Sequence, residues 1–470
     1  MPKQKKQVQK VLIANRGEIA LRVIRACREL GLQTVAVHST VDTDALHVRF
    51  ADEAVCIGPA PSLKSYLNIP AIMAAAEITG ADSIHPGYGF LSENAEFADI
   101  SEQCGLTFIG PSPDDMKKWG GKVPARTLAR SLGIPLLPGT GVLADADEAA
   151  REANKIGYPI ILKASAGGGG RGMKICRSEE EVRRQLPQAQ HEALTGFKNP
   201  DVYLERYVEE PRHIEFQVLC DPKTEMVMVL GERECSIQRR HQKVIEEAPS
   251  VAMTDEMRGD IAQTITRAMK ETGYRSAGTL EFLLDERNNL YFMEMNTRIQ
   301  VEHTVTELVT GIDLVCEQIR IAAGWPVQFP KEPVKPRGHA IECRINAEDP
   351  ESFAPWPGLI TEYVPPGGPG VRVDGGIFSG WRVPGDYDSL IVKLCTYGRT
   401  RQESIVRMRR ALDEMVVDGI RTNIPLHRRI MDEPDFYEGR LSTKFLDRLL
   451  PKMKEEKAAR LAAEAAAAKG

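Results

Sequence analysis

The stretch Glu294-Met295-Asn296-Thr297-Arg298-Ile299-Gln300-Val301-Glu302-His303 places metal-ligating, anion-binding and proton-accepting groups in one short run. Its alternation of polar and apolar residues predicts an extended strand over residues 290–302, in which every second side chain lies on the same face. The polar face would carry Glu294, Asn296, Arg298, Gln300 and Glu302. The apolar face would carry Tyr291, Met293, Met295, Ile299 and Val301.

A hairpin turns this strand into a candidate metal site. Residues 279–284 have the composition of a second strand, and a hairpin centred between Arg287 and Asn288 places Glu281 directly opposite Glu294. Opposed residues have Cβ atoms roughly 5 Å apart, where two carboxylates repel each other unless a cation neutralises them. Carboxylate and amide oxygens are ligands that suit Mg²⁺. The alternative is a solvated hairpin edge that binds no metal.

Length and composition exclude several classes of function. A chain of 470 residues exceeds what one hydrophobic core usually serves, so we expect about two to three domains. The 61 Lys and Arg against 66 Asp and Glu give a net charge of −5, which argues against a protein dedicated to nucleic acid or to an anionic membrane.

The nine cysteines show no C-x-x-C spacing, so we expect reduced thiols in the cytoplasm. We find neither an apolar run of about 18 residues nor the apolar core of a signal peptide, so we expect no membrane anchor and no export.

The beginning of the chain predicts a β-α-β unit. Residues 11–14 are apolar, apolar residues recur at helical spacing over residues 19–30, and residues 34–37 form the next strand. The turn holds one glycine, Gly17, where the dinucleotide-binding fingerprint requires three. NAD binding is therefore not expected.

Two glycine-rich loops are candidate ligand sites. The first, residues 85–91, follows a short strand, and Ser92 is the expected cap of the helix after it. The second, residues 163–172, holds four consecutive glycines bracketed by Lys163 and Arg171. Its backbone N–H groups can approach phosphate oxygens closely, but the lysine precedes the glycines, so this is not a Walker A loop. We interpret it as a mobile flap over a nucleotide, with a flexible linker as the alternative.

A second basic segment is the run Gln238-Arg239-Arg240-His241-Gln242-Lys243. Taken alone, such a run is more often a solvated face or a nucleic-acid contact than a catalytic element. The net acidity of the chain and the presence of a phosphate-type loop favour a site for small anions such as phosphate or bicarbonate.

Five segments resemble, in order, the signatures of the biotin carboxylases, a family of the ATP-grasp superfamily. They are residues 13–20, 85–94, 239–249, 294–303 and 342–350, and the resemblance covers the chain from Val11 to about Leu450. It implies an α/β and α+β architecture: an ATP-grasp fold with an N-terminal Rossmann-like β-α-β domain, a mobile glycine-rich lid and a C-terminal mixed β domain. The implied bounds are 8–117 for the N-terminal α/β domain, 118–330 for the ATP-grasp domain with its lid at 137–207, 337–449 for the C-terminal biotin carboxylase domain, and 450–470 for a polar tail.

The resemblance also implies a reaction in two stages. ATP phosphorylates bicarbonate to carboxyphosphate, and the CO₂ that this releases is captured by the N1 nitrogen of biotin, with ADP and phosphate as the other products. The implied cofactors are ATP and Mg²⁺ or Mn²⁺, with biotin as a carrier-bound substrate. The residues implied at the nucleotide are Lys122, Lys163, Gly169, Gly170, Glu205, Arg206, Tyr207, Val208, His213, His241, Glu281 and Glu294.

The same resemblance implies the metal, bicarbonate and biotin residues. Glu281, Glu294 and Asn296 match the metal ligands, in agreement with the hairpin. Arg344 matches the residue that stabilises the biotin enolate, for which a structural salt bridge is the alternative. Glu302 matches the general base, and a carboxylate deprotonates bicarbonate efficiently only if its pKa is raised or cations hold the product anion. The residues implied at bicarbonate and biotin are Lys243, Arg298, Gln300, the backbone of Val301, Arg344 and Tyr88, and those implied in catalysis are Arg298, Glu302, Arg344 and Lys243.

Partners follow from the resemblance as well. A free-standing subunit of this family, usually a homodimer, works with a biotin carboxyl carrier protein and a carboxyltransferase subunit. Lys452-Met453-Lys454 reverses the Met-Lys-Met order of a biotinyl domain, so we expect the carrier to be a separate protein. The final acceptor stays open: acetyl-CoA in fatty acid synthesis, another acyl-CoA, or pyruvate or another 2-oxo acid.

Three positions depart from the family pattern, and two other functions compete. Gly121 stands where an acidic residue is usual, Arg206 replaces a frequent lysine, and Trp356 replaces a small residue in a turn that we expect the carrier protein to approach. One competing function is that of another ATP-grasp carboxylate-amine ligase, against which Arg344 and the loop at 85–94 argue. The other is a catalytically silent regulatory or scaffold subunit, which the intact set of catalytic residues disfavours.

Overall fold

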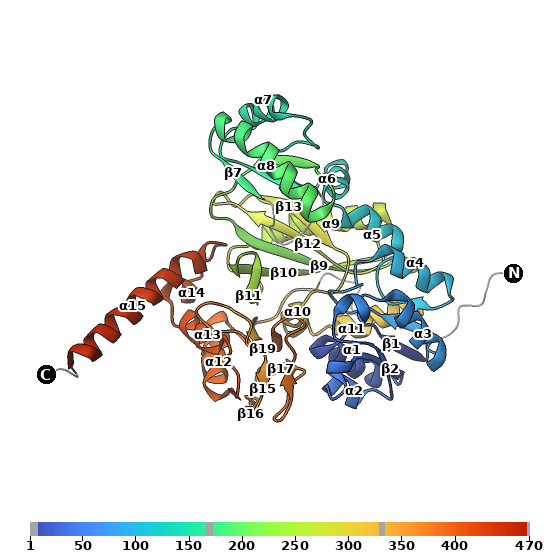
Figure 1. Ribbon diagram of the computed structural model, residues 1–470. Helices are drawn as coiled ribbons and strands as arrows, with labels where there is room; N and C mark the ends of the chain where they lie inside the picture. Colours follow the sequence, from blue (N-terminus) through green and yellow to red (C-terminus); the bar gives the residue numbers. More distant parts are fainter. Residues whose placement is uncertain (1–7, 166–172, 329–333, 468–470) are drawn as a thin grey trace.

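The computed structural model describes residues 8–165, 173–328 and 334–467 of the chain. Figure 1 shows an N-terminal α/β region in blue, a small outlying sheet with its helices at the top, and a C-terminal region in orange and red. A long sheet in the middle continues into the C-terminal region.

The N-terminal region is built on a parallel sheet, as the β-α-β pattern predicts. Its strand order is β3-β2-β1-β4-β5, so the order reverses at β1, and the loops after β1 and β4 leave the same edge. Helix α1 buries Ile19, Val23 and Ile24. The strands are β1 (Lys10–Ile13), β2 (Gln33–Ser39), β3 (Glu53–Gly58), β4 (Ser83–His85) and β5 (Thr107–Phe108). The helices are α1 (Gly17–Glu29), η1 (Thr40–Asp42), α2 (Leu46–Phe50), η2 (Ser62–Lys64), α3 (Ile69–Thr79), α4 (Ala95–Gln103) and α5 (Pro113–Gly120).

The outlying sheet contains the segment that the sequence predicts to be a lid. Its three strands are antiparallel in the order β7-β6-β8, and α7 and α8 pack on it. Residues 166–172, with most of the predicted phosphate loop, lie outside the described residues. The elements are α6 (Lys122–Ser131), α7 (Ala146–Ile156), β6 (Ile160–Ala164), β7 (Lys174–Cys176), α8 (Glu179–Phe197) and β8 (Val202–Arg206).

One eight-stranded antiparallel sheet runs through the rest of the molecule in the order β13-β12-β9-β10-β11-β14-β19-β17. Residues 326–338 are rich in Pro and Gly and indicate a domain boundary, yet the sheet continues across it. The joint is the β11–β14 ladder, where Ile245 lies opposite Cys343 and Ala248 lies opposite Ala340. The strands are β9 (Arg212–Asp221), β10 (Met226–Arg239), β11 (Gln242–Ala248), β12 (Ser276–Leu284), β13 (Leu290–Asn296), β14 (His339–Asn346), β17 (Val371–Gly375) and β19 (Leu390–Gly398).

Helices cover this sheet and close its apolar cores. Helix α9 packs on β10, α10 on β14, and α12 on β19. Two short ladders, β15 with β18 and β16 with β20, complete the C-terminal region. Among the described residues, none of the helices combines the length and hydropathy that a membrane span requires. The remaining elements are α9 (Asp255–Thr272), α10 (His303–Thr310), α11 (Leu314–Ala323), β15 (Gly358–Leu359), β16 (Glu362–Val364), β18 (Arg382–Val383), α12 (Arg401–Glu414), β20 (Val416–Asp418), α13 (Ile424–Met431) and α14 (Pro434–Tyr437).

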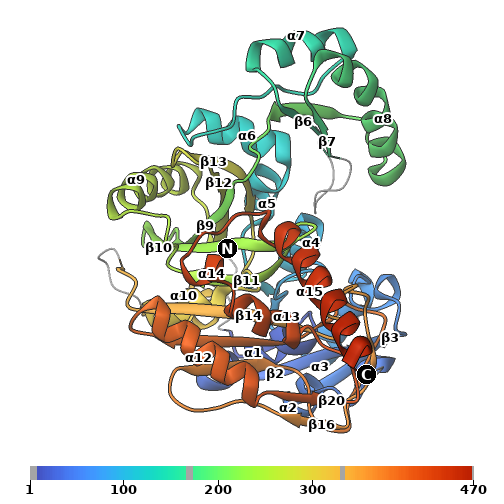
Figure 2. The same ribbon diagram turned by 90° about the vertical axis from the view of Figure 1, so that its left-hand side faces the viewer.

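The polar tail forms the second part of a long helix, α15 (Phe445–Ala467). Figure 1 shows this helix leaving the body of the molecule, and in Figure 2, seen from that side, it lies in front. Its first turn is anchored, because Leu446 and Leu449 are buried. Further along, Lys457 pairs with Glu351 at 2.5 Å, and residues 458–464 after it are exposed.

The β12–β13 hairpin has the predicted register with one irregularity. Glu281 lies directly opposite Glu294, as a hairpin centred between Arg287 and Asn288 requires, so this prediction is confirmed. The register shifts before the next pair, which makes Met293 an extra residue in the strand. Met293 and Val301 line the site cavity together with Glu294 and Gln300, so the prediction that they lie on the opposite, apolar face is wrong.

The prediction of one extended strand to residue 302 is also wrong. Strand β13 ends at Asn296, residues 297–300 bend, and Glu302 is the residue before α10. The bend is held by Glu93, whose carboxylate accepts a hydrogen bond from the backbone N–H of Thr297 at 3.0 Å. A contact with so distant a part of the chain has no signature in the local pattern.

Helix α4 follows the loop at 85–91, but Ser92 is not its cap. The cap is Asn94, whose side-chain oxygen accepts a hydrogen bond from the backbone N–H of Phe97 at 2.8 Å. Ser92 is buried in the turn before the helix.

Candidate active site

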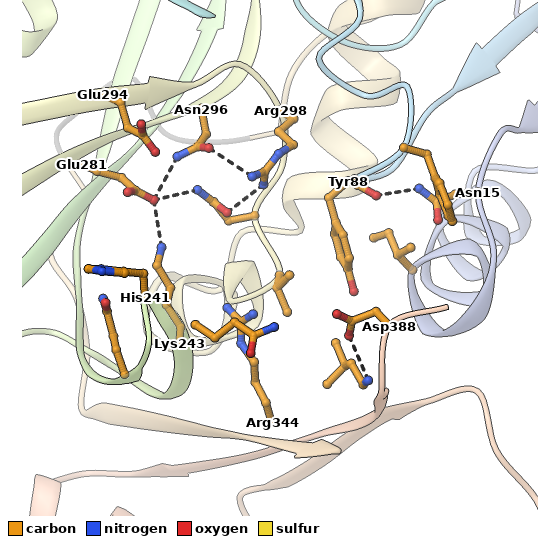
Figure 3. Close-up of a pocket in the computed structure, with 18 of the residues that line it drawn as sticks. Asn15, Tyr88, His241, Lys243, Glu281, Glu294, Asn296, Arg298, Arg344 and Asp388 are labelled. Atoms are coloured by element: carbon orange, nitrogen blue, oxygen red, sulfur yellow. Dashed lines mark hydrogen bonds and ion pairs between the residues drawn. The ribbon is translucent and has the colours of Figure 1, made fainter. Parts of the chain in front are cut away.

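A cavity of about 720 Å³ lies where the N-terminal loops, the long sheet and the C-terminal region meet (Figure 3). Its walls include the loops after β1 and β4, the β12–β13 hairpin, the β10–β11 turn and strand β14. The predicted site residues that line it are Tyr88, Lys122, Lys163, His213, His241, Lys243, Glu281, Glu294, Asn296, Arg298, Gln300, Val301 and Arg344.

The other predicted nucleotide residues lie elsewhere. Glu205 and Arg206 end strand β8, and Tyr207 and Val208 follow it, outside the set of residues that line the cavity. Glu205 is buried and accepts a hydrogen bond from Lys163 Nζ at 2.6 Å, which connects β8 to the cavity through that lysine. The predictions for Gly169 and Gly170 fall on residues outside those that the structure describes.

Three carboxylates form one row across the long sheet. Glu294 of β13 lies opposite Glu281 of β12, which lies opposite Glu215 of β9. Arg233 of β10 is the next residue in the row and contacts Glu215. Because opposed side chains lie on the same face, the row concentrates negative charge at its Glu294 end, away from the arginine.

The end of this row fits a divalent cation. Among the residues drawn in Figure 3, no hydrogen bond or ion pair reaches the Glu294 carboxylate. Burial raises the pKa of Glu294, and the charge of Glu281 acts in the same direction. Asn296 Nδ2 donates to Glu281 Oε1 at 2.9 Å, so an amide lies beside the two carboxylates. The two carboxylates supply oxygen ligands of the kind that Mg²⁺ prefers, and the amide oxygen of Asn296, which here accepts a hydrogen bond from Arg298, would be the third.

Lys243, near the start of β11, binds three carboxylates at once. Its Nζ lies 2.5 Å from Glu215, 2.9 Å from Glu281 and 2.6 Å from Glu302. Burial alone would lower the pKa of Lys243, but the three carboxylates raise it well above its ordinary value. Lys243 is therefore a permanent cation between the carboxylate row and Glu302.

Arg298 lies in the bend after β13 and is held from three sides. Its Nε donates to Glu93 at 2.9 Å, Nη1 to Gln300 at 2.8 Å and Nη2 to Asn296 at 3.0 Å. A planar guanidinium presents its donors as a fork that matches a bidentate oxyanion. The position of Arg298 in the cavity wall makes it available to a small anion such as bicarbonate.

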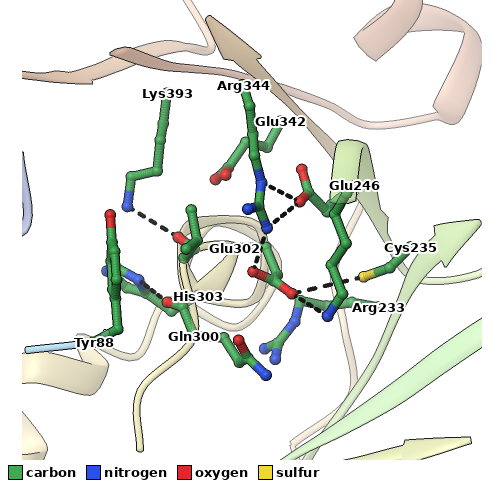
Figure 4. Close-up of polar contacts among 12 residues, drawn as sticks. Tyr88, Arg233, Cys235, Glu246, Gln300, Glu302, His303, Glu342, Arg344 and Lys393 are labelled. Carbon is green, nitrogen blue, oxygen red and sulfur yellow. Dashed lines mark hydrogen bonds and ion pairs between the residues drawn. The ribbon is translucent and has the colours of Figure 1, made fainter. Parts of the chain in front are cut away.

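Glu302 is fully buried and is bound by two cations, Lys243 and Arg344. Figure 4 shows Arg344 beside its carboxylate. Its Oε2 accepts a hydrogen bond from Arg344 Nη2 at 2.8 Å, and Arg344 Nε donates to Glu246 at 2.6 Å. Burial alone would raise the pKa of Glu302, but Lys243, Arg344 and Arg233 hold it well below its ordinary range. A carboxylate becomes an effective base for bicarbonate either through a raised pKa or through cations that hold the product anion. The lowered pKa of Glu302 favours the second of these.

The remaining wall comes from the N-terminal region. Asn15 Nδ2 donates to the carbonyl oxygens of Pro86 at 2.8 Å and of Tyr88 at 2.7 Å, which ties the loop at 85–91 to the loop after β1. Figure 3 shows Tyr88 and Arg344 on different sides of the cavity. The hydroxyl of Tyr88 contacts Glu18.

Comparison with known proteins assigns the family. Family models match in order: "Biotin carboxylase, N-terminal domain" at residues 7–116, "Carbamoyl-phosphate synthase L chain, ATP binding domain" at 121–329, and "Biotin carboxylase C-terminal domain" at 342–448. A biotin carboxylase of Haemophilus influenzae is 56% identical over 445 residues, which are 94% of this chain and 99% of that protein. The chain belongs to the biotin carboxylase family. The enzyme class and the ATP-grasp fold that the sequence predicts are therefore confirmed.

Other biotin carboxylases agree over nearly the full chain. The chloroplast biotin carboxylase of Arabidopsis thaliana is 52% identical over 93% of this chain and 82% of that protein. The solved biotin carboxylase of Campylobacter jejuni, an ATP complex, is 46% identical and has a TM-score of 0.91 over 94% of this chain and 99% of that chain. The biotin carboxylase domain of Hydrogenobacter thermophilus 2-oxoglutarate carboxylase, solved as a dimer with MgADP, ADP and bicarbonate, is 49% identical with a TM-score of 0.89 over 94% of this chain and 98% of that chain.

Sequence analysis of this biotin carboxylase sequence missed three acidic residues that hold the site cations. They are Glu93, which binds Arg298, Glu215, which binds Lys243, and Glu246, which binds Arg344. Glu215 had a usable signal, because it alternates with other polar residues along the otherwise apolar strand β9.

The departures from the biotin carboxylase pattern lie outside the catalytic cluster. Gly121 precedes α6 with φ −87°, a value open to any residue, and gives the helix no side-chain cap. Arg206 is exposed at the end of β8. Trp356 is 41% exposed, with the Arg421 guanidinium 4.5 Å from its ring centre, and it does not line the cavity. An effect of Trp356 on carrier docking stays a prediction.

Proposed function

We propose that the chain carboxylates biotin on a biotin carboxyl carrier protein, using ATP and bicarbonate and releasing ADP and phosphate. One observation carries this proposal: a single cavity joins the Glu281–Glu294 carboxylate pair to Lys243 and Arg344, the two cations that bind the buried carboxylate of Glu302. The first part fits a metal-bound nucleotide, and the second fits bicarbonate.

The nucleotide half works by position and charge. Bound Mg²⁺ or Mn²⁺, held by Glu281, Glu294 and Asn296, would neutralise charge on the ATP phosphates during phosphoryl transfer. Lys122 and Lys163 line the cavity, and burial together with the charges of Lys122 and Arg126 lowers the pKa of Lys163 to about 7. The negative charge of bound ATP phosphates would favour the protonated form of Lys163. We assign Glu205 to Val208, His213 and His241 to the nucleoside, and Gly169 and Gly170 to the loop over the phosphates.

The bicarbonate half forms carboxyphosphate. Glu302 takes the proton of bicarbonate, and Arg298 and Lys243 hold the resulting anion, with Gln300 and the Val301 backbone beside them. A bicarbonate oxygen then forms a bond to the γ-phosphorus of ATP, the bond between that phosphorus and the β–γ bridging oxygen breaks, and ADP leaves. Because Lys243 and Arg298 are fixed before substrate binds, their stabilisation costs no rearrangement during the reaction.

The second stage of the reaction, carboxylation of biotin, uses Arg344, which binds the other oxygen of Glu302. Carboxyphosphate breaks down to CO₂ and phosphate, the released phosphate takes the proton of biotin N1, and N1 forms a bond to the CO₂ carbon. Arg344 stabilises the biotin enolate, and Tyr88 forms the facing wall. The hydrogen bond of Arg344 to Glu302, at 2.8 Å, supports a shared cluster for both stages.

Partners and domain limits belong to this proposal. We infer a homodimer, a carrier protein and a carboxyltransferase subunit as partners, and we retain the domain bounds 8–117, 118–330 and 337–449. Another carboxylate-amine ligase would have no use for Arg344 in the wall opposite Tyr88, and a silent scaffold would not keep the whole cation and carboxylate cluster.

The first test is ATP cleavage by the purified chain. We expect ATP cleavage to require bicarbonate and to be stimulated by free biotin, because biotin reacts with the CO₂ that carboxyphosphate releases in the cavity. Hydrolysis that proceeds equally well without bicarbonate and without biotin would overturn the proposal. Testing biotinylated carrier proteins from the same cell as substrates would then identify the physiological partner.

A further inference from the structure

Lys393 and Glu18 form a buried ion pair that the proposed reaction does not use. Lys393 on β19 is 0% exposed, and its Nζ lies 3.2 Å from Glu18 Oε2 on α1. The two residues come from opposite ends of the chain. Removing both charges from water costs several kcal/mol per ion, and well-packed apolar residues can replace such a pair without loss of stability, so stability alone does not account for it.

One of these hydrogen bonds reaches the bicarbonate segment. Lys393 Nζ donates to the carbonyl oxygen of Val301 at 2.9 Å (Figure 4). That carbonyl belongs to the peptide that joins Val301 to Glu302. Lys393 also lies directly opposite Arg344 in the β14–β19 ladder, so the two side chains share a face of the sheet. Lys393 therefore holds the backbone next to Glu302 while Arg344 holds the Glu302 carboxylate.

The other member of the pair reaches the opposite wall. The Glu18 carboxylate contacts the hydroxyl of Tyr88, and both residues line the cavity. Lys393 Nζ is 5.9 Å from the centre of the Tyr88 ring. One buried pair thus connects Val301 on one wall with Tyr88 on the other.

The surroundings keep Lys393 charged. Burial alone would lower the pKa of Lys393, but Glu18, Glu342 and Asp374 together raise it. Asp374 lies opposite Lys393 in the β17–β19 ladder. The lysine is therefore a fixed donor, and its hydrogen bond to Val301 persists across the ordinary pH range.

We propose that Glu18 and Lys393 are positioning residues for the biotin and bicarbonate half of the site. This inference rests on the proposed function, because Val301 and Tyr88 matter only if that half binds those substrates. The pair fixes the Val301 carbonyl and the Tyr88 hydroxyl and so sets the separation of the two walls. The nucleotide half is built on β12 and β13 and does not depend on the pair.

Steady-state kinetics of Lys393→Met, Glu18→Gln and the double variant test the proposal. We expect each single variant to raise KM for free biotin about tenfold and to leave KM for ATP within about twofold. The double variant should be no worse than the worse single variant, because the two residues act through one contact. A purely structural role would lower the melting temperature or the active fraction and leave the KM for biotin unchanged.

Glu247→Gln is the matched control. Glu247 is buried and paired with Arg401 at 2.6 Å, but neither residue lines the cavity. This variant should lose thermal stability and keep the wild-type KM for biotin. If Lys393→Met does not fold, Glu18→Gln, which keeps the shape of the side chain, decides the question.

The outcomes separate this inference from the proposed function. A wild-type chain that shows no biotin-stimulated ATP cleavage contradicts the proposed function itself. A wild-type chain that shows it, with Glu18→Gln at the wild-type KM for biotin, contradicts the positioning role alone.

Discussion

Glu302 combines two properties that oppose each other in a general base. Two cations bind its carboxylate, and with Arg233 they hold its pKa well below the ordinary value. A low pKa weakens the driving force for taking a proton from bicarbonate. The same cations lie where they can stabilise the anion that the proton transfer creates, so the loss in basicity is offset in the product. The two cations therefore promote the reaction mainly by stabilising the anion formed from bicarbonate, and not by making Glu302 a stronger base.

This arrangement predicts that the ionisation of Glu302 gives kcat/KM for bicarbonate no pH dependence near neutral pH. Because the pKa of Glu302 is lowered from 4.5, its carboxylate is ionised above pH 4.5 and stays ionised somewhat below it. No acid limb of kcat/KM for bicarbonate should then arise from Glu302 between about pH 6 and 8. Glu302→Gln should lower kcat/KM by about 10²-fold, by the same factor at each pH, because the wild-type residue does not titrate there.

Pairs of pH profiles for the wild type and Glu302→Gln measure this directly. Glu247→Gln, a buried carboxylate away from the cavity, is the control for loss of a buried charge. A ratio between wild type and Glu302→Gln that shrinks as the pH falls from 8 to 6 would show that Glu302 titrates in that range, against the depressed pKa.

The β12–β13 hairpin shows what local pattern can and cannot predict about an element. The position of the turn sets the pairing of Glu281 with Glu294, because each residue counted back along one strand matches one counted forward along the other. The end of β13 is different, since the bend after Asn296 depends on Glu93, which lies 204 positions from Thr297. Polar residues at every second position occur both in a strand and in a bend that enters a helix, so the alternation in this stretch did not distinguish them.

The same hairpin predicts how a metal ligand behaves when it is neutralised. Glu294→Gln should raise the Mg²⁺ concentration needed for half-maximal ATP cleavage about tenfold, because one of two carboxylates is lost from the site. Without metal, the variant should melt at a higher temperature than the wild type, because burial and Glu281 disfavour the charge of Glu294. Melting curves with and without Mg²⁺ test both effects.

Glu286→Gln is the control for this hairpin, because Glu286 is exposed in its turn. It should change neither the magnesium dependence nor the melting temperature. An unchanged magnesium dependence in Glu294→Gln would count against the metal site.

At the scale of the whole molecule, the long sheet is the feature that sequence analysis did not predict. The Pro- and Gly-rich residues 326–338 predict a domain boundary, and in the chain they stand between α11 and β14. The β11–β14 pairing across it is nonlocal, and no residue pattern within either segment encodes which edge strands will meet. Its consequence is functional: Arg344 stands on the same sheet as Lys243 and Glu281, so the groups proposed for the two reaction stages keep a fixed relation.

The N-terminal region has no strand in that sheet and is joined to the C-terminal region by side chains. Tyr387, in the loop before β19, is one of these joints: its hydroxyl lies 2.6 Å from the carbonyl oxygen of Ala60 and 2.7 Å from Ser39 Oγ. The Arg16 guanidinium lies 4.2 Å from the centre of the Tyr387 ring, and Asp42 holds that guanidinium through two hydrogen bonds of 2.6 and 2.7 Å.

Tyr387→Phe should therefore loosen the joint between the two regions without disturbing either core. Removing the hydroxyl leaves buried partners without a hydrogen bond, which costs about 1 to 2 kcal/mol and lowers the melting temperature by a few degrees, on the order of 2 °C. The matched control is Tyr437→Phe, since Tyr437 at the end of α14 is 43% exposed. Differential scanning calorimetry of the two variants measures the effect, and equal melting temperatures for both would show that the Tyr387 hydroxyl does not hold the regions together.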